Sequence, residues 1–471
     1  MESGKWAVVV SMLLTAVGCG TIFNATEAQK ALQAKGTGAT EASAKVDLTD
    51  RSLEELVRFA MTNRPSVLAA ALAVADARLA LREIAADAPL VSASPWTAPH
   101  LSLSGGYSAS SAAEQHLKWR TEGNVSAGLS LQVLLYDFGR NQAQANAQVE
   151  KVIAAEYELV REGYSVFEDV SGAYFELLRR DALLKVAVTN EAEYAMHLKQ
   201  AEDRLAAGEA QRLDVARAKL DLSQAKETVI AASNAVVTTG AELMKALGID
   251  ASRGTREEVY PLPGDTLSAV MRGFADTHYD VDSAFALART NAPSMAIARA
   301  RFRSADHAVD RAIADLMPDV SAEVGLSWAD PLWAWHWGVN AVQSVFQGFR
   351  KVTAVDRAVV ALQSAAATVD ETEQQLSLDL ETAIAVRDNA VKARETARAS
   401  VIAAKENLDM VKARYLEGDA SRVDFTDSVS DYATALGSRI TAFYNGQIAE
   451  ARLFALTGRL PEYCEEIVKE K

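Results

Sequence analysis

A short stretch of this chain occurs twice, 210 residues apart and in the same register. The first copy is RLAAGEAQRLDV at 204–215, and the second is RYLEGDASRVDF at 414–425. Each copy interrupts a long helical pattern with a glycine and restarts it a few residues later, which is typical of a turn between two helices. We therefore expect two copies of one unit, each containing a helical hairpin. The recurring pairs are Arg204 and Arg414, Gly208 and Gly418, Arg212 and Arg422, and Asp214 and Asp424.

Two further pairs of matching motifs support the duplication. LYDFGR at 135–140 and VFQGFR at 345–350 also end in arginines 210 residues apart. Near the start of each half, Asn63 and Pro65 match Asn291 and Pro293, where the offset is 228. The first half thus carries 18 extra residues between its proline and its arginine. Repeats of this length differ from the short units of solenoid proteins.

The repeats give a domain organisation. The first unit is expected at 51–248 and the second at 281–458, with a short tail at 459–471. Between them, 249–280 contains the chain-breaking sequence VYPLPGD and is expected to be a linker.

The N-terminus has the pattern of a signal peptide. Residues 1–18 hold Lys5 and then an apolar run that is too short to span a bilayer. Ala16-Val17-Gly18 before Cys19 resembles a lipoprotein cleavage box, although that box usually has leucine where Ala16 stands. The small residues also suit ordinary signal peptidase, so two interpretations stay open. We expect lipidation at Cys19, followed by a tether over 19–50.

Charge and composition exclude several classes of protein. A net charge of −15 leaves no basic surplus for binding nucleic acid. With two cysteines and six scattered histidines, neither a disulfide framework nor metal-ligand spacing is present. The sequence contains no nucleophile elbow, phosphate-binding glycine loop or HExxH pair. We expect no enzyme, no metal and no cofactor.

After the first helical segment of each half, which begins near Ser52 and Asp282, the hydrophobic period changes to two. This alternation predicts four strands in two hairpins, at about 101–110, 124–133, 320–328 and 333–340. The apolar face includes Leu129 and Val324, and the opposite face is rich in serine. Three tryptophans share the apolar face of the last strand: Trp333, Trp335 and Trp337.

Two interpretations of these strands compete. One is a half-buried antiparallel sheet that packs on helices. The other is a sheet with a lipid-facing outer side, an aromatic girdle and a watery lumen, which the tryptophans and the leader favour. Four strands cannot close a barrel, and an open edge in lipid would leave backbone groups unsatisfied. Several chains must then contribute, and three chains giving twelve strands suit small polar lumen residues better than two.

The longest segments are helical. Between Arg140 and Gly208, and between Arg350 and Gly418, no proline occurs, so each helix can extend roughly 100 Å from the membrane. Returning helices are expected from Leu213 towards Leu247 and from Val423 towards Leu456. A stripe on the first long helix predicts packing in a bundle, and its members are Val160, Tyr164, Phe167, Val170, Tyr174, Leu177, Leu184 and Val188.

The order of these motifs, repeated twice between Ser52 and Gly458, resembles the TolC family of bacterial outer-membrane efflux proteins. The resemblance implies a mixed α and β membrane protein. Long helical hairpins would form a periplasmic tunnel, and four transmembrane strands per chain would contribute to a trimeric 12-stranded barrel. It also implies a passive exit duct of a tripartite efflux or type I secretion system. The implied partners are a periplasmic adaptor and an inner-membrane pump or ABC exporter. The rival hypothesis is a periplasmic helical scaffold lipoprotein without a channel.

The resemblance also implies roles for residues at the hairpin turns. The turns around Arg204, Gly208, Arg414 and Gly418 would meet the adaptor, although both glycines also suit ordinary helix ends. A periplasmic gate would use Asp214, Tyr415, Asp424 and Asp427. For Asp424 a second role stays open, because Ser421 to Asp424 has capping-box spacing.

This chain departs from the family pattern at three kinds of position. Leu134 and Ser344 replace a proline before the strand exit, and Gln347 stands where the first half has Asp137. Ala420 occupies the place of a gate arginine in some relatives, so the closing bonds are expected to differ here.

Overall fold

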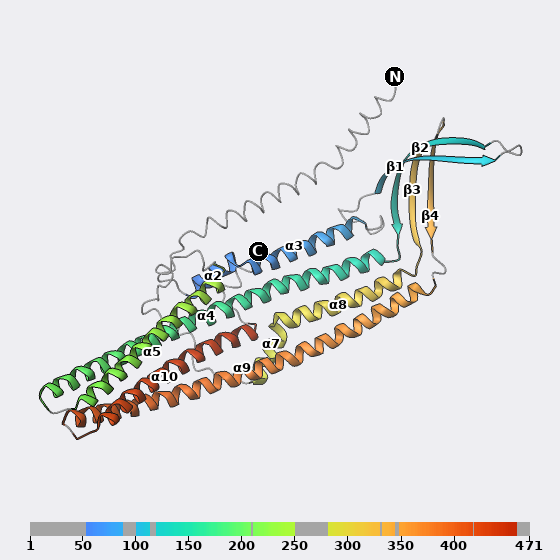
Figure 1. Ribbon diagram of the computed structural model, residues 1–471. Coiled ribbons are helices and arrows are strands. Elements are labelled where there is room, and N and C mark those ends of the chain that lie inside the picture. The colour runs from blue at the N-terminus through green and yellow to red at the C-terminus, as the bar shows by residue number, and fades with distance from the viewer. Residues whose placement is uncertain are drawn as a thin grey trace.

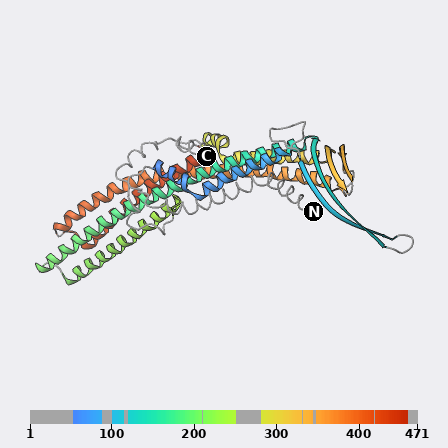
Figure 2. The same ribbon diagram turned by 90° about the horizontal axis from the view of Figure 1, so that it is seen from above.

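The structure is a computed structural model that describes residues 53–87, 100–113, 119–208, 211–249, 281–329, 332–343, 348–417 and 419–458. Within these residues the molecule is elongated, with a small sheet at one end and the turns of two helical hairpins at the other (Figures 1 and 2). The predicted mixed α and β fold is confirmed. The signal peptide, Cys19, the tether, Gly418, almost all of the 249–280 linker and the tail lie outside the described residues.

The two halves contain the same elements in the same order. In the first half these are α2 (Leu53–Asn63), α3 (Pro65–Ala86), β1 (His100–Ala113), β2 (Trp119–Tyr136), α4 (Arg140–Ala206) and α5 (Arg212–Ala246). In the second they are α7 (Val281–Asn291), α8 (Pro293–Ala314), β3 (Asp319–Ala329), β4 (Leu332–Val342), α9 (Arg350–Glu417) and α10 (Arg422–Leu456). Pro65 separates α2 from α3 and Pro293 separates α7 from α8, each at the first position of the second helix.

The four strands form one antiparallel sheet in the order β1-β2-β3-β4. The two predicted hairpins are joined because β2 pairs with β3, where Leu129 lies opposite Leu326. A register shift between Leu134 and Tyr136 bends the end of β2 before the chain enters α4. β1 and β4 are the two edges of the sheet.

The exits from the strands differ between the halves. Before α4, the buried carboxylate of Asp137 accepts hydrogen bonds from the backbone N–H of Gly139 at 3.2 Å and of Asn141 at 2.7 Å. It thereby caps the helix. Phe138 and Gly139 both adopt positive φ angles there, and Gly348 and Phe349 do so before α9. Gln347, the counterpart of Asp137, lies outside the described residues.

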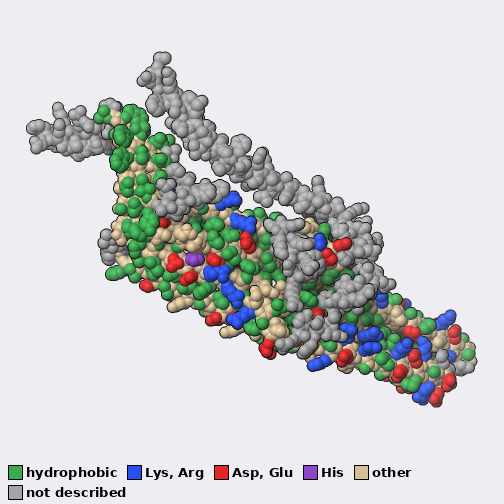
Figure 3. Space-filling model, turned by 180° about the vertical axis from the view of Figure 1, so that it is seen from behind, with side chains coloured by type: hydrophobic (Ala, Val, Ile, Leu, Met, Phe, Trp, Pro, Cys, Tyr) green, Lys and Arg blue, Asp and Glu red, His purple; other side chains and the backbone are tan. Residues whose placement is uncertain are grey.

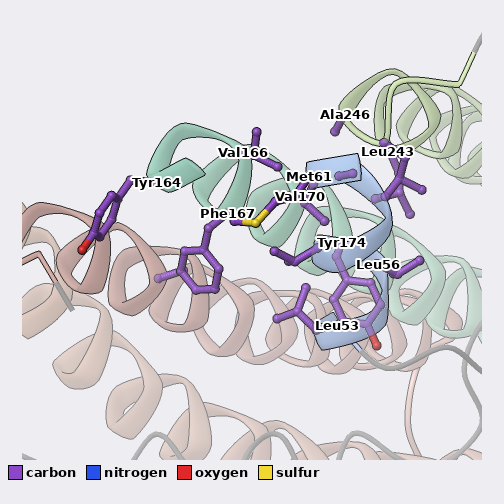
Figure 4. Close-up of a cluster of buried hydrophobic side chains, with 14 of the residues drawn as sticks. Leu53, Leu56, Met61, Tyr164, Val166, Phe167, Val170, Tyr174, Leu243 and Ala246 are labelled. Carbon is purple, nitrogen blue, oxygen red and sulfur yellow. The ribbon is translucent and has the colours of Figure 1, made fainter. Parts of the chain in front are cut away.

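The main hydrophobic core lies where α2 crosses the middle of α4, close to the end of α5 (Figure 4). Tyr164, Phe167, Val170, Tyr174 and Leu177 of the predicted stripe are buried in it or beside it. Leu184 is half-buried, and 48% of the surface of Val188 is exposed in a single chain, so packing of Val188 stays a prediction. An α-helix drifts relative to a heptad repeat, so the far end of a long stripe faces a different side from its start.

Both returning helices end in glycines that pack on the proline kinks. Gly248 has φ +78°, and a Cβ there would lie 3.2 Å from the Cα of Arg64, the residue before Pro65. Gly458 has φ +69°, and a Cβ would lie 2.8 Å from backbone atoms of Asn291. In each half, the glycine at the end of the returning helix therefore packs against the Asn-x-Pro motif.

Candidate functional site

Two regions of the structure hold the residues that the sequence singles out: the apolar face of the sheet and the turns of the helical hairpins. On the sheet, strand register aligns one apolar row across all four strands, formed by Leu103, Leu129, Leu326 and Trp335. A second row continues it through Leu131, Val324 and Trp337. These side chains are exposed, and the exposed fractions of Trp335 and Trp337 are 73% and 70%.

Such a face is unusual for a water-soluble surface. Figure 3 shows hydrophobic side chains over the sheet, while charged side chains gather along the helices and towards the hairpin turns. A contiguous exposed apolar patch marks a lipid or protein contact. Trp333, the third predicted tryptophan, is also exposed and lies beside Trp328 with their ring centroids 6.3 Å apart.

The opposite face of the sheet is polar. The hydroxyl groups of Ser102 and Ser130 are 2.6 Å apart, and Ser104 donates to the carbonyl of Gly128 at 3.3 Å. On the next strands, His336 Nε2 lies 3.9 Å from Glu323 Oε1. The pleat therefore separates an apolar surface from a polar one, as the lumen and lipid sides of a membrane barrel require.

At the far end of the molecule, an aromatic cluster joins the two hairpins. Tyr415 of α9 is buried, and its ring stacks on Phe425 of α10 with centroids 5.1 Å apart. His197 of α4 stacks on Phe425 with centroids 5.2 Å apart, and its Nε2 lies 3.1 Å from the Tyr415 hydroxyl. We call His197, Tyr415 and Phe425 the tip cluster.

The tip cluster is surrounded by charged groups. Arg204 lies over the Tyr415 ring, with Cζ 5.0 Å from the centroid, and donates to the Tyr415 backbone carbonyl at 3.2 Å. Arg422 of α10 forms a largely buried ion pair with Asp221 of α5 at 2.6 Å. Contacts thus cross from each hairpin to the other, because Arg204 and Asp221 belong to the first half and their partners to the second.

Burial gives His197 unusual electrostatics. Only 1% of its surface is exposed, and its Nδ1 has no hydrogen-bond partner among the described residues. Burial lowers the pKa of the imidazole, and the guanidinium groups of Arg422 and Arg204 lower it further, while Asp221 opposes them. His197 is therefore held neutral between two cations.

The two predicted gate aspartates of the repeated motif are the N3 residues of capping boxes, at the start of α5 and of α10. The Asp424 carboxylate accepts hydrogen bonds from the N–H of Ser421 at 3.1 Å and from its hydroxyl at 2.8 Å. These bonds lower the pKa of Asp424. Asp214 accepts from the N–H of Gln211 at 3.1 Å, in the same position of the first half. The capping box expected from Ser421 to Asp424 is confirmed.

Asp427 and the predicted adaptor-docking residues differ in their surroundings. Asp427 is exposed, and its charge helps to raise the pKa of Tyr194 on α4, where burial is the larger cause. Gly208 has φ +83° and open space around it. Arg414, the counterpart of Arg204, pairs with Asp419 at 3.3 Å in its own turn, and among the described residues it has no ion pair with the other hairpin.

Sequence reasoning missed His197, Phe425 and the Arg422–Asp221 pair as site residues. A signal for part of the cluster exists in the repeat itself. The second copy has Tyr415 and Phe425 where the first has Leu205 and Val215, so aromatic rings replace aliphatic side chains at two positions of one turn. His197 carries no such mark, since nothing local distinguishes it from an exposed histidine.

Comparisons with known proteins agree with this geometry. The sequence matches the family described as "Outer membrane efflux protein" over residues 56–249 and 285–459. No significant match exists among curated protein sequences. Among solved structures, a membrane protein from Pseudomonas aeruginosa is 20% identical, with a TM-score of 0.74 and coverage of 88% of this chain and 93% of that chain.

Two further structures have the same fold. The outer membrane protein VceC from Vibrio cholerae is 18% identical, with a TM-score of 0.70, covering 86% of this chain and 96% of that chain. The CmeC outer membrane channel of Campylobacter jejuni is 15% identical, with a TM-score of 0.74 and 89% coverage of both chains. The likeness extends over the sheet and the helical hairpins together.

Proposed function

Because this chain belongs to the outer membrane efflux protein family, we propose that three copies of it assemble into one channel across the outer membrane. The chain itself is the outer-membrane channel component of an efflux system. Family membership favours this function over the alternative of a periplasmic scaffold lipoprotein without a channel. The family also consists of channels, which transport without catalysis.

The sheet carries the proposal of a shared barrel. Its apolar face is exposed in a single chain, and both β1 and β4 are edges. Lipid can cover the apolar face, but it cannot satisfy the N–H and C=O groups of an open edge. Pairing β4 of one copy with β1 of the next satisfies both edges, and three copies give a closed barrel of about twelve strands.

The helices support the same arrangement. α8 packs against both α4 and α9, while its first-half counterpart α3 packs against α4 and has no extensive contact with α9 among the described residues. The uncovered side of α3 presents Leu68, Leu72 and Leu79, and α9 presents Val352 and Val360. In a ring of three copies, α3 can pack on α9 of the neighbouring copy. This contact would bury the exposed leucines of α3 and the exposed valines of α9.

An apolar stretch of α9 is explained by this packing. α9 is the one described helix that contains an 18-residue window apolar enough to cross a membrane, with a mean hydropathy of 1.2. None of that window is buried in a single chain. α9 extends far from the sheet (Figure 1), so contact with neighbouring helices accounts for its apolar character.

The hairpin turns are proposed as the periplasmic gate. Movement of one hairpin against the other would have to break the tip cluster and the Arg422–Asp221 pair, together with the ion pair between Lys412 of α9 and Glu193 of α4. Asp427 is exposed near this point, where three copies would bring their carboxylates together. Tyr415 would hold the gate closed through His197 and Arg204, and Asp214 and Asp424 would fix the first turns of the returning helices.

The proposed partners are a periplasmic adaptor and an inner-membrane pump or ABC exporter. The adaptor would contact the turns at Arg204, Gly208, Arg414 and Gly418, where the open space around Gly208 supports close approach of another backbone. We also propose a lipid anchor on Cys19. The intact mass of the mature protein tests the anchor, and an N-terminus without acyl chains would contradict it.

The channel is tested by native mass in detergent and by conductance in a planar bilayer. We expect a trimer, and a conductance that requires the trimer. Trp335→Phe is a suitable control, because it makes the exposed side chain smaller but keeps the face apolar and aromatic. We expect this variant to form the trimer and to conduct as the parent does. A monomer in mild detergent, or a trimer that never conducts even after the hairpin contacts are broken, would overturn the proposal.

A further inference from the structure

A basic groove lies along the second helical hairpin, away from both the sheet and the tip cluster. It has a volume of about 700 Å³ and is formed by side chains of α9 and α10, with Ala182 of α4 at one side. Three arginines line it: Arg394 and Arg398 from α9, and Arg439 from α10. Arg394 is 23 residues before the end of α9, which places the groove about 35 Å from the hairpin turn.

The apolar part of the groove lies beside these charges. Leu436, Ile440 and Phe443 of α10 are half-buried and line the same space. The guanidinium carbon of Arg394 lies 5.8 Å from the centroid of the Phe443 ring. The groove therefore offers an aromatic and aliphatic wall next to three cations, which is the composition of a small-molecule site.

The three arginines are exposed, and none of them forms an ion pair with a described residue. Glu395 lines the groove as well, yet it lies beyond ion-pair distance of all three. Arg394 and Arg398 are four residues apart on one helix, a spacing at which like charges destabilise the helix. Within the part of the chain that the structure describes, nothing neutralises these three arginines, and this favours the binding of an anion.

The duplication shows that the hairpin fold does not require these arginines. At the same register positions of the first half, 210 residues earlier, stand Leu184, Val188 and Val229. The first hairpin is thus built with aliphatic side chains at all three places. The positive charge is a property of the second hairpin alone and needs an explanation other than helix packing.

We infer that this groove binds an amphipathic anion, a small molecule that carries a carboxylate, phosphate or sulfonate group on an apolar body. The guanidinium groups would bind the anionic group through charge-assisted, bidentate hydrogen bonds. The apolar body would lie against Phe443 and Ile440. A volume of about 700 Å³ is within the range of small-molecule pockets and too small for a folded partner.

The test uses the full chain in lipid nanodiscs and equilibrium dialysis of 1-naphthyl phosphate, with empty nanodiscs as background. We expect saturable binding that weakens with added salt or inorganic phosphate, and weaker binding of the neutral analogue 1-naphthol. Arg394→Gln and Arg439→Gln should each reduce affinity about tenfold. Arg394→Lys should reduce affinity by less than Arg394→Gln, because lysine keeps the positive charge although it lacks the planar guanidinium group.

Arg357→Gln is the matched control, because Arg357 is an exposed arginine of the same helix outside the groove. Its binding of 1-naphthyl phosphate should equal that of the parent. Equal binding of 1-naphthol, an equal loss in Arg357→Gln, or no saturable binding would each overturn the inference. If the groove variants fail to assemble, two measurements on the parent protein still test the inference. These are the salt dependence of 1-naphthyl phosphate binding and the comparison of its affinity with that of 1-naphthol. Because binding is measured without current, its outcome is independent of whether the channel conducts.

Discussion

The imidazole of His197 in α4 lies 3.1 Å from the hydroxyl oxygen of Tyr415 in α9, and this pair links the two helical hairpins at the end farthest from the sheet. Both side chains are buried. The link joins residues that are 218 positions apart. A movement that separates α4 from α9 at this end would break the link, which contains the one described histidine that is fully buried.

Acidification should weaken this link. The native pKa of His197 is lowered, so the unfolded or separated state binds a proton more readily. The contribution of neutral His197 to stability is complete above its ordinary pKa of about 6.5 and is lost as the pH falls below that value towards the lowered native pKa. We expect channel opening in planar bilayers to increase over this range, because a charged imidazole would face Arg204 and Arg422.

His197→Phe removes the titrating group and retains a ring that can stack on Phe425. Its conductance should lose the increase between neutral and mildly acidic pH. His307→Phe is the matched control, because His307 is a half-exposed histidine of α8. The conductance of this variant should depend on pH as that of the parent does. If His197→Phe keeps the pH response of the parent, His197 is not the group that responds.

The ion pair between Arg422 and Asp221 should matter more than the pair between Arg414 and Asp419. The side chains of the first pair are 18% and 22% exposed, and those of the second are 61% and 74% exposed. Asp221→Asn leaves a largely buried guanidinium without its carboxylate and should destabilise the tip by about 1–3 kcal/mol. Asp419→Asn should cost about 0–1 kcal/mol, as for an exposed pair. Limited proteolysis of the hairpin ends measures both, and equal sensitivity would contradict the difference.

The sheet should tolerate charge on one face only. Leu129 lies in the exposed apolar row, while Ser130 lies on the polar face with its hydroxyl 2.6 Å from that of Ser102. Leu129→Arg should cost about 2–4 kcal/mol per chain if it reaches the bilayer midplane, and a trimer carries the cost three times. Ser130→Arg should insert far better. Heat-stable trimer in outer-membrane fractions is the measurement, and equal yields would indicate a soluble sheet.

Gly458 should be hard to replace. Its φ of +69° disfavours any L side chain, and an added Cβ would lie 2.8 Å from the backbone of Asn291. Gly458→Ala should therefore lower stability by at least about 1–2 kcal/mol from the backbone conformation alone. Gly172 is the control, because it lies inside α4 with nothing within 4 Å of an added Cβ, so Gly172→Ala should be neutral or stabilising. Denaturation midpoints compare the two, and an unaffected Gly458→Ala would show that the kink and the helix end move independently.

Asp427 should control block by cations. It is exposed beside the tip cluster, three residues after the capping Asp424 and on the same side of α10. If three copies bring it to a narrow opening, a trivalent cation should block ion flow, more strongly at low salt. Asp427→Ala should relieve that block. Asp424→Asn should relieve it less, since Asp424 already accepts two hydrogen bonds from Ser421, and block that persists in Asp427→Ala would remove Asp427 from the gate.

The sequence alone determined the local structure. Alternation of apolar residues located all four strands, because side chains on a strand point to opposite faces in turn. Glycine and proline located the ends of helices, and the repeat of Asn63–Pro65 at Asn291–Pro293 marked two equivalent kinks. The capping box at Ser421 and Asp424 could be identified for the same reason, since both partners lie within one turn of helix.

Only the tertiary structure decided which faces of the long helices meet. A helix such as α4 drifts by about 20° per heptad relative to its repeat, so the direction of a side chain cannot be counted over dozens of residues. Val188, a member of the predicted packing stripe, is exposed in the single chain, whereas His197, nine residues later, is buried. The contacts of His197 with Tyr415, of Arg204 with Tyr415 and of Arg422 with Asp221 each join segments about two hundred residues apart. They depend on the relative rotation of four helices, which no local pattern records.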